Sequence, residues 1–289
     1  MLPKRSRPEE GPRTAGSIPW LVLAGGVLFT IAAATFVNAS VRQRDRARFE
    51  NAVQGAQDLI LGRLDLYVAT LRGGAALFSA VDPVTADHFT RYVGRLDVQG
   101  RYPGVQGIGW SERIGRDGDG PDDAGPHERH AIRYLEPPDE RNRAALGFDM
   151  YSEPTRRAAM AAARDLGRAV LSGRVTLVQE IIGPPQPGFL LYVPVYEGGG
   201  RPATAAARRD SLLGHVYAPF RASDLFEGIF GSQAGPRVSF RVYDGVRPDP
   251  AALLHASPTT PGFRPAFQET RVINVVRRPW TSEYASTPG

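Results

Sequence analysis

Apolar and polar residues follow three successive patterns along this chain. Between Arg13 and Arg42 no residue is charged, and residues 18–37 supply about the 20 apolar positions that cross a bilayer as a helix. Next comes a stripe in which apolar residues recur every three or four positions, so that they share one face of a long helix: Phe49, Val53, Ala56, Ile60, Leu64, Tyr67, Leu71, Ala75 and Phe78. Beyond Asp82 the chain changes to shorter segments.

These shorter segments mix strand and helix signals. We expect strands at residues 105–110, 131–135, 175–182, 189–196, 212–219, 238–243 and 271–276. Helices are expected just after Thr85, which can cap one, at residues 153–166 with Ser152 as N-cap, and at residues 222–230. Residues 117–128 and 197–211 are predicted to be exposed loops. Because strands and helices do not alternate strictly, the pattern predicts an α+β fold with antiparallel sheets.

The first apolar segment has two interpretations. It can be an uncleaved membrane anchor with Trp20 at the interface, or a secretory signal cleaved after Ala39. The segment is longer than the roughly 7–15 apolar residues of a signal peptide, which favours the anchor. Arginines flank it on both sides and leave its orientation open, but either interpretation places the residues after about 41 outside the cytoplasm.

Composition narrows the chemistry. The 289 residues include no cysteine, which excludes disulfides and thiolate catalysis, and the net charge of +5 comes without the dense basic stripe of a nucleic-acid-binding protein. The HERH run at residues 127–130 is not HExxH and is expected in a loop, and the acidic residues 117–123 lack the pattern of a calcium loop. Neither Ser111 nor Ser172 has a catalytic context. We therefore expect no catalytic residue, no metal and no cofactor.

The stretch GFDMYSEPTRRAAMAAARDLG, residues 147–167, sets a bulky cluster against an alanine-rich helix that ends at Gly167. The small side chains allow a sheet to approach the helix closely, and glycine suits its C-terminal cap. Most of the stretch is therefore expected to be architectural, with residues 148–151 at the junction of helix and sheet.

The order of these motifs resembles the CHASE family. It runs through a membrane span, a long helix, YPGVQGIGW, the GFDMYSEP stretch, AVLSGRVTLVQE, GFLLYVPVY and RRPWTSEYASTP, over roughly residues 49–288. CHASE domains are extracytoplasmic sensory domains of histidine kinases and of nucleotide and diguanylate cyclases, and they include the plant cytokinin receptors. The resemblance implies a stalk helix, two PAS-like antiparallel-sheet subdomains, and a final strand near residues 271–284. Members continue into a second membrane helix and an output module, so we expect this chain to be a fragment or a truncated member.

The resemblance also implies a ligand pocket in the membrane-distal subdomain. It points to the segment before GFDM, where Asp139 or Glu140 lies nearest to an aspartate of the cytokinin-receptor branch, and to Phe148 at the helix–sheet junction. It further points to Ser172 and to the strand carrying Leu190 and Tyr192, which share one face. The uncertain position of the aspartate argues against cytokinin specificity.

The expected organisation is a cytoplasmic tail (1–17), a transmembrane helix (18–41), a stalk (42–80) and a sensory domain (81–289). The sensory domain would divide into distal (about 100–197) and proximal (about 210–289) subdomains. The expected function is small-molecule sensing in a receptor of the inner membrane, with a periplasmic domain and a homodimer formed through the stalk. The alternatives are a dimerisation module that binds no ligand or recognises a protein, and a secreted binding protein.

Overall fold

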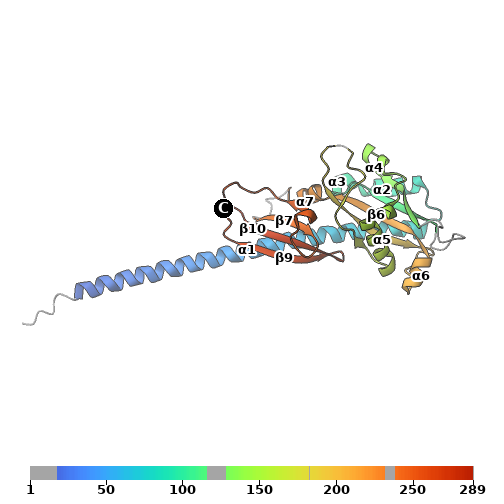
Figure 1. Cartoon of the computed structure of the whole chain (residues 1–289). Coiled ribbons are helices and arrows are strands. Elements are labelled where there is room, and N and C mark those ends of the chain that lie inside the picture. The colour runs from blue at the N-terminus through green and yellow to red at the C-terminus, as the bar shows by residue number, and fades with distance from the viewer. Residues whose placement is uncertain (1–17, 116–127, 182, 232–237, 289) are drawn as a thin grey trace, which may run out of the picture. The chain divides into compact units, whose positions relative to one another are not determined.

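The computed structural model describes residues 18–115, 128–181, 183–231 and 238–288. The chain divides into two units, Met1–Glu50 and Asn51–Gly289. One helix, α1 (Ile18–Ala80), contributes residues to both units (Figure 1).

In the first unit, the described residues form the N-terminal part of α1. Large apolar side chains are exposed all around it, among them Trp20, Phe29 and Phe36, each more than 70% exposed. The most apolar 18-residue window has a mean hydropathy of 2.1, so this helix can cross a membrane by length and composition. A helix that is apolar on every side is typical of a segment surrounded by lipid.

In the second unit, α1 buries the face that the spacing of apolar residues predicts. Val53, Ile60 and Leu64 are fully buried, and Tyr67 and Leu71 continue the buried stripe. The predicted amphipathic helix is therefore confirmed.

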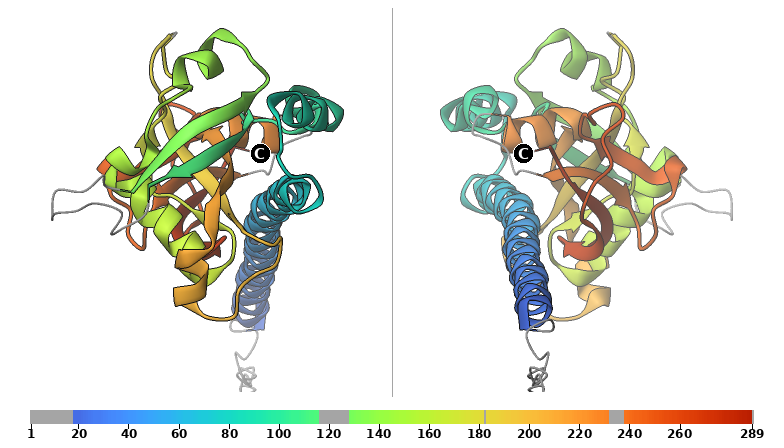
Figure 2. Two further views of the ribbon diagram at one scale, coloured as in Figure 1. Left: turned by 90° about the vertical axis from the view of Figure 1, so that its right-hand side faces the viewer. Right: turned by 90° about the vertical axis from the view of Figure 1, so that its left-hand side faces the viewer.

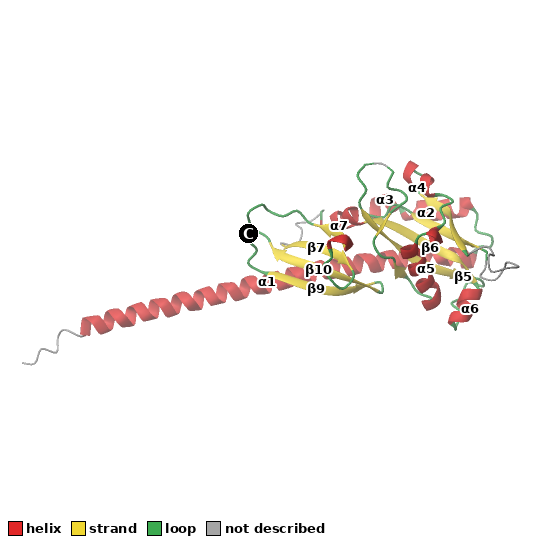
Figure 3. Cartoon of the chain, in the orientation of Figure 1, coloured by secondary structure: helices red, strands yellow, loops and turns green. Residues whose placement is uncertain are grey.

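The first sheet has six antiparallel strands in the order β2-β1-β6-β5-β3, with β4 also paired to β5. Figure 3 draws the strands in yellow and labels β5 and β6 of this sheet. The longest pairing joins β5 and β6, from Gly188 opposite Arg221 to Tyr196 opposite Leu212. The strands are β1 (Ile108–Ile114), β2 (Arg129–Glu136), β3 (Val170–Leu171), β4 (Val175–Thr176), β5 (Pro187–Tyr196) and β6 (Leu212–Arg221).

Helices cover both faces of this sheet (Figure 2). On one face lie α1, α2 (Ala86–Leu96) and α3 (Val98–Arg101), and the ring of Tyr67 on α1 lies 5.1 Å from that of Phe220 on β6. On the other face lie α4 (Glu140–Ala145), η1 (Met150–Ser152) and α5 (Pro154–Leu166). Here His215 on β6 is hydrogen-bonded through Nε2 to the carbonyl of Met160 on α5, at 3.1 Å.

The second sheet has four antiparallel strands in the order β8-β7-β10-β9. Its strands are β7 (Val238–Asp244), β8 (Leu253–Ala256), β9 (Gln268–Val275) and β10 (Arg278–Ser286). Before it come α6 (Ala205–Asp210) and α7 (Ala222–Phe230), and η2 (Pro250–Ala252) precedes β8. The two antiparallel sheets with their helices confirm the α+β class, and α7 matches its predicted range.

Aromatic rings form the interior beneath the second sheet. We call this group the second-sheet cluster: Phe226, Phe240, His255, Trp280 and Tyr284, with neighbouring ring centroids 5.0–6.4 Å apart. The ring of Phe189, at the start of β5, lies 5.2 Å from Trp280 and 5.0 Å from Phe220. Phe189 therefore joins the interiors of the two sheets.

Two predicted segments of the first sheet are wrong in extent. The strand expected at residues 175–182 ends after Thr176, because the chain turns at Leu177, whose carbonyl accepts a hydrogen bond from the amide of Glu180. The strand expected at 105–110 begins only at Ile108; Val105 forms one isolated bridge with Phe220.

Two predicted helix boundaries are settled by capping side chains. Thr85 does cap α2, since its side chain accepts a hydrogen bond from the amide of His88. At α5 the N-cap is Glu153 rather than Ser152, because the Glu153 carboxylate accepts hydrogen bonds from the amides of Thr155 and Arg156 at 2.9 and 2.8 Å. Ser152 belongs to η1 instead.

The loop expected at residues 197–211 contains the helix α6. Thr204 caps it, and the buried Arg208 donates hydrogen bonds to the carbonyls of Asp165, Pro202 and Ala203. A buried arginine with this many acceptors holds the segment against α5, which an exposed flexible loop would not require.

The single final strand expected near residues 271–284 is a hairpin of β9 and β10. The chain reverses at Val276 and Arg277, which both have positive φ, at 43° and 69°. Two successive residues of this kind form the tight turn whose twist suits a two-residue hairpin.

The HERH run is likewise not confined to a loop, because Arg129 and His130 belong to β2. The acidic residues 117–123 and His127 lie outside the described residues.

Candidate ligand-binding site

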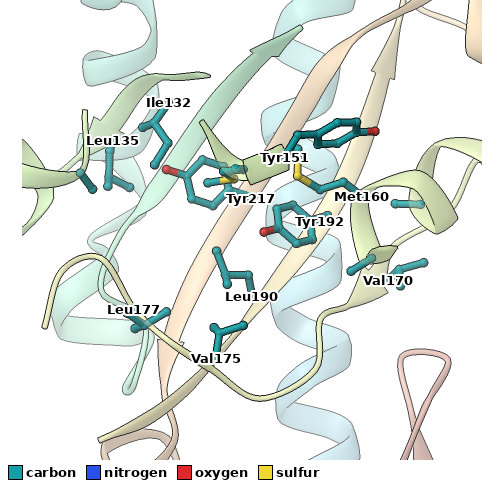
Figure 4. Close-up of a cluster of buried hydrophobic side chains, with 14 residues drawn as sticks. Ile132, Leu135, Tyr151, Met160, Val170, Val175, Leu177, Leu190, Tyr192 and Tyr217 are labelled. Carbon is teal, nitrogen blue, oxygen red and sulfur yellow. The ribbon is translucent and has the colours of Figure 1, made fainter. Parts of the chain in front are cut away.

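Between the first sheet and the layer of α4, η1 and α5 lies a dense group of buried side chains, which we call the first-sheet cluster (Figure 4). Phe148, Ala162 and Val178 pack against its edge. Its members are Ile132, Leu135, Ala145, Met150, Tyr151, Ala159, Met160, Ala163, Val170, Val175, Leu177, Leu190, Tyr192 and Tyr217.

Two tyrosines bring hydroxyl groups into this apolar interior. Tyr192 on β5 and Tyr217 on β6 face each other across the strand pair and are fully buried. Within the described part of the chain, neither hydroxyl has a hydrogen-bond partner. Both hydroxyl groups point to the same side of the cluster (Figure 4). A buried, unpaired hydroxyl costs about 1–3 kcal/mol, so two of them side by side indicate a site where a partner is missing.

A glycine on the neighbouring strand makes room for one of these rings. Gly109 pairs with Tyr217 across β1 and β6, and a Cβ atom at Gly109 would lie 2.5 Å from the Tyr217 ring. Only a residue without a side chain allows the ring to lie across β1. The glycine at position 109 therefore allows the Tyr217 ring to take its place in the sheet.

Arg156 adds a buried positive charge beside the tyrosines. It lies in the first turn of α5, is 3% exposed, and donates one hydrogen bond to the carbonyl of Thr176 at 2.9 Å. Its guanidinium lies 4.9 Å from the centre of the Phe148 ring. Glu153 is 4.0 Å away, at the limit of an ion pair, and among the described residues Nε of Arg156 has no hydrogen-bond acceptor.

Burial fixes the protonation of the polar groups in and around the cluster. It raises the pKa of Tyr192 and Tyr217 well above their ordinary range, so both hydroxyls keep their protons at neutral pH. Burial also lowers the pKa of His215, reinforced by the neighbouring His130, so that His215 is neutral. The site therefore offers neutral O–H groups and one guanidinium, which suits a ligand with a hydrogen-bond acceptor.

Several of the predicted site residues meet in this cluster. Leu190 and Tyr192 belong to it and share one face of β5, as alternation predicts, and Phe148 lies at its edge. Ser172 is buried close by, but its hydroxyl accepts a hydrogen bond from the amide of Leu190 and donates one to the carbonyl of Gly173, both at 2.8 Å. The structure thus gives Ser172 a role in holding β3 against β5, and its contact with a ligand stays a prediction.

Asp139 and Glu140 do not belong to the cluster. Asp139 is the N-cap of α4 and accepts a hydrogen bond from the amide of Asn142 at 2.8 Å, while Glu140 is exposed in the first turn. Asn142 itself is fully buried, and within the described residues its Oδ1 atom has no partner. The sequence analysis predicted Asp139 and Glu140 as site residues of this segment and did not predict the buried side-chain amide of Asn142.

Arg156 and Tyr217 were also missed, although the sequence carries a signal for each. Arg156 shares a helix face with Ala159, Met160 and Ala163, which follow it at three, four and seven positions. Tyr217 alternates with Val216 and Ala218 in a strand that the pattern did predict. Helical and strand periodicity, applied to every residue type, would have placed both side chains inside.

The chain between β3 and β5 lies across the cluster and contributes Val175 and Leu177 to it (Figure 4). Glu180 fastens this segment: its buried carboxylate lies 2.7 Å from Nε of Arg221 and 3.9 Å from a guanidinium nitrogen of Arg141. Arg221 ends β6 and Arg141 lies on α4, so the segment is fixed to both layers.

The fold and the cluster define a class of domain, a PAS-like α+β domain with a buried polar centre between sheet and helices. The CHASE domain family model matches residues 82–255, more than half of the chain. The chain therefore belongs to the CHASE domain family and contains a sensory receptor domain.

Three solved structures are similar to this chain. An extracellular ligand-binding receptor from Desulfohalobium retbaense is 14% identical, with a TM-score of 0.49, over 81% of this chain and 39% of that one. Methyl-accepting chemotaxis protein X is 12% identical, with a TM-score of 0.49, over 85% and 100%. The ligand-binding domain of the Pseudomonas aeruginosa amino acid chemoreceptor PctB, in complex with L-Arg, is 11% identical, with a TM-score of 0.48, over 86% and 95%.

This chain thus spans 39% of the length of the first of these structures. Among curated proteins, no relative matches. Within the residues that the structure describes, no group of three or more histidine, aspartate and glutamate side chains is arranged to hold a metal ion.

Proposed function

We propose that this chain is the extracytoplasmic sensor of a receptor anchored in the inner membrane, with its first-sheet cluster as the ligand site. The receptor's output would be a histidine kinase or a nucleotide or diguanylate cyclase, and the chain itself would be sensory rather than catalytic. Residues after about 41 would be periplasmic, which places the domain among extracellular solutes. The family match and the apolar N-terminal helix support this arrangement.

One observation carries the proposal: besides Tyr151, whose hydroxyl points the other way, three buried polar groups in one apolar layer have no partner among the described residues. They are the hydroxyls of Tyr192 and Tyr217 and Nε of Arg156. A small molecule with an acceptor group, such as a carbonyl, a carboxylate or a ring nitrogen, would satisfy all three while its apolar part replaces cluster side chains. Its entry would displace the segment that Glu180 fastens.

Such a ligand stabilises the folded state by mass action, by about 2.7 kcal/mol at 100 times its dissociation constant. Thermal unfolding of the full chain in detergent, screened against amino acids, organic acids and adenine derivatives, should find a compound that raises Tm with concentration. The rise should disappear in the double variant Tyr192→Phe/Tyr217→Phe. A broad library without any shift, from a chain shown to be folded, would instead favour a ligand-free module.

We also propose that two copies pair through the exposed face of α1. The predicted apolar stripe from Val53 to Leu71 is buried within the chain and is therefore occupied. A second stripe remains exposed, with steps of four and three residues: Gly55, Leu59, Gly62, Leu66, Ala69, Gly73 and Ala76. This is the heptad spacing of helices that pack against each other.

Two glycines in this second stripe support the pairing. Glycine within a helix costs about 1 kcal/mol relative to alanine, and around Gly55 and Gly62 an added Cβ atom would meet nothing within 4 Å. Nothing in the described chain explains the two glycines, whereas a close approach by a second helix would.

Gly62→Leu tests this pairing. We expect it to shift the full chain in detergent from dimer to monomer in analytical ultracentrifugation. Gln54→Ala should leave the dimer intact, because Gln54 is exposed and no residue three or four positions from it belongs to the stripe. A dimer that survives Gly62→Leu unchanged would remove this face as the interface.

A further inference from the structure

A second candidate site lies on the outer side of the first-sheet cluster's helical layer. It is a cavity of about 530 Å³ between β2, η1 and α5. From α5 it receives Arg157, Ala161 and Arg164, whose spacing of four and three residues places them along one edge of the helix. This edge differs from the one that carries Arg156 and Met160 into the cluster. The other lining residues are Glu128, Arg129, Asp149, Tyr151 and Ser152.

The two carboxylates of this cavity already interact with other groups of the protein. Glu128 is 5% exposed and lies 2.9 Å from Arg113, 3.4 Å from Arg164 and 3.1 Å from His130. Burial opposes its ionisation, but the hydrogen bond from His130 and the two arginines lower the pKa of Glu128 below its usual value, so it is charged. One oxygen of Asp149 accepts the amides of His130 and Tyr151 at 2.9 and 3.1 Å.

Positive charge is in excess among the lining residues, since three arginines accompany two carboxylates. Arg157 is exposed and, within the described residues, makes one hydrogen bond, from Nη1 to the carbonyl of Tyr151 at 3.1 Å. A guanidinium carries five N–H donors, so Arg157 can present several more to the cavity. Arg129 lies 3.7 Å from Asp149, beyond hydrogen-bonding distance, and its side chain is 55% exposed.

Tyr151 supplies the observation that points to a ligand. The residue is 8% exposed, and within the described chain its hydroxyl has no hydrogen-bond partner. Its ring lies 4.0 Å from that of His130, and its hydroxyl points away from those of Tyr192 and Tyr217 (Figure 4). Burial, with the nearby Glu128 charge, raises the pKa of Tyr151, so the hydroxyl remains a donor.

We propose that this cavity binds a small anion with a carboxylate or phosphate group, which accepts hydrogen bonds from Tyr151 and from the guanidinium of Arg157. Arg129 and Arg164 add positive charge around it. The site is separate from the ligand site proposed in the first-sheet cluster, and it goes beyond that function. Tyr151 links the two, because its ring belongs to the cluster while its hydroxyl serves the anion. An anion would thereby restrain one wall of the cluster.

The test uses the full chain in detergent at pH 7.5, titrated separately with sodium succinate and inorganic phosphate while thermal unfolding is followed. Sodium chloride at matched ionic strength is the control for screening. We expect one of the two anions to raise Tm with concentration above the chloride control. The anion that binds shows whether the site prefers a carboxylate or a phosphate group.

Two variants locate the binding site. Arg157→Gln and Tyr151→Phe should each weaken the anion's affinity by roughly tenfold or more. Arg157 is exposed and Phe keeps the ring of Tyr151, so both variants are expected to fold. Arg143→Gln, an exposed arginine on α4, should leave the affinity unchanged. Tyr192→Phe should leave it unchanged as well, which separates this site from the cluster's own ligand.

No Tm rise with either anion, or a rise that persists in both Arg157→Gln and Tyr151→Phe, overturns the proposal. Loss of the rise in Tyr192→Phe would overturn it too, because the anion would then occupy the first-sheet cluster.

Discussion

The two sheets bury their interiors in different ways. The second-sheet cluster consists of closely packed aromatic rings, most of them tilted against each other and one pair, Phe226 and Phe240, edge to face at 64°, with Trp280 at 1% exposure. The first-sheet cluster is just as buried but carries three hydroxyls without partners among the described residues, those of Tyr151, Tyr192 and Tyr217, against the single hydroxyl of Tyr284 in the second-sheet cluster. Unpaired polar groups lower stability and persist where they have a function. Their concentration in the first-sheet cluster therefore supports the ligand site proposed there, with the second sheet as its support.

The largest effect should come from removing the tryptophan of the second-sheet cluster. Trp280→Ala would leave a cavity next to Phe189 and Phe226 and should lower the free energy of unfolding by about 3–5 kcal/mol. Urea unfolding followed by circular dichroism measures this loss. A cost below about 1 kcal/mol would show that the second sheet is loosely packed, and the contrast between the sheets would fail.

Acid should weaken the second-sheet cluster through His255. Burial lowers the pKa of His255 to about 4, from an ordinary value of 6.5. Between these values the unfolded chain binds more protons, so stability falls as pH decreases from about 6.5 through 4. After allowance for solvent screening, His255 should account for about 1–2 kcal/mol of that loss.

Chemical unfolding of the chain and of His255→Leu, at pH 7 and at pH 4.5, measures this contribution. The variant should lose less stability between the two pH values than the parent chain. Equal losses in both proteins would assign the acid sensitivity to other groups, with His130 and His215 as the next candidates, since burial also lowers the pKa of each.

The smallest effect on stability, and the sharpest contrast, should come from single hydroxyl groups. Tyr192→Phe or Tyr217→Phe removes an unpaired hydroxyl, so urea unfolding should show unchanged stability or a gain of up to about 1 kcal/mol. Tyr196→Phe is the matched control, because Tyr196 lies on β5 with Tyr192. Its hydroxyl donates a hydrogen bond to the carbonyl of Arg164 at 2.6 Å, so its removal should cost about 1 kcal/mol. A similar cost at all three positions would mean that the cluster hydroxyls are paired in solution.

Local patterns predicted those parts of the fold that depend on neighbours in sequence. The helical spacing identified the buried face of α1, a threonine cap marked the start of α2, and alternation placed Leu190 and Tyr192 on one face of β5. In each case the deciding interaction lies within a few residues, so the sequence displays it directly.

Other features either depend on distant contacts or lack the sequence signal that usually marks them. The hairpin turn at Val276 and Arg277 lacks the Asn-Gly signal that usually marks such turns, so β9 and β10 were predicted as one strand. Glu180 turns inward because Arg221, 41 residues away, binds its carboxylate. Asp139 was predicted from its place in the family resemblance, and the structure shows it as the N-cap of α4. Arginine is usually exposed, so Arg156 was not expected inside.

The ten residues of β5 have a mechanical consequence. A strand rises about 3.3 Å per residue, so Phe189 and Tyr192 lie about 10 Å apart on opposite faces of one nearly inextensible segment. Phe189 presses against Trp280 beneath the second sheet, while Tyr192 occupies the first-sheet cluster. In the proposed receptor, a ligand that moved Tyr192 along the strand would move Phe189 by a similar amount. The strand would then transmit the movement to the second sheet directly, without a relay of side chains.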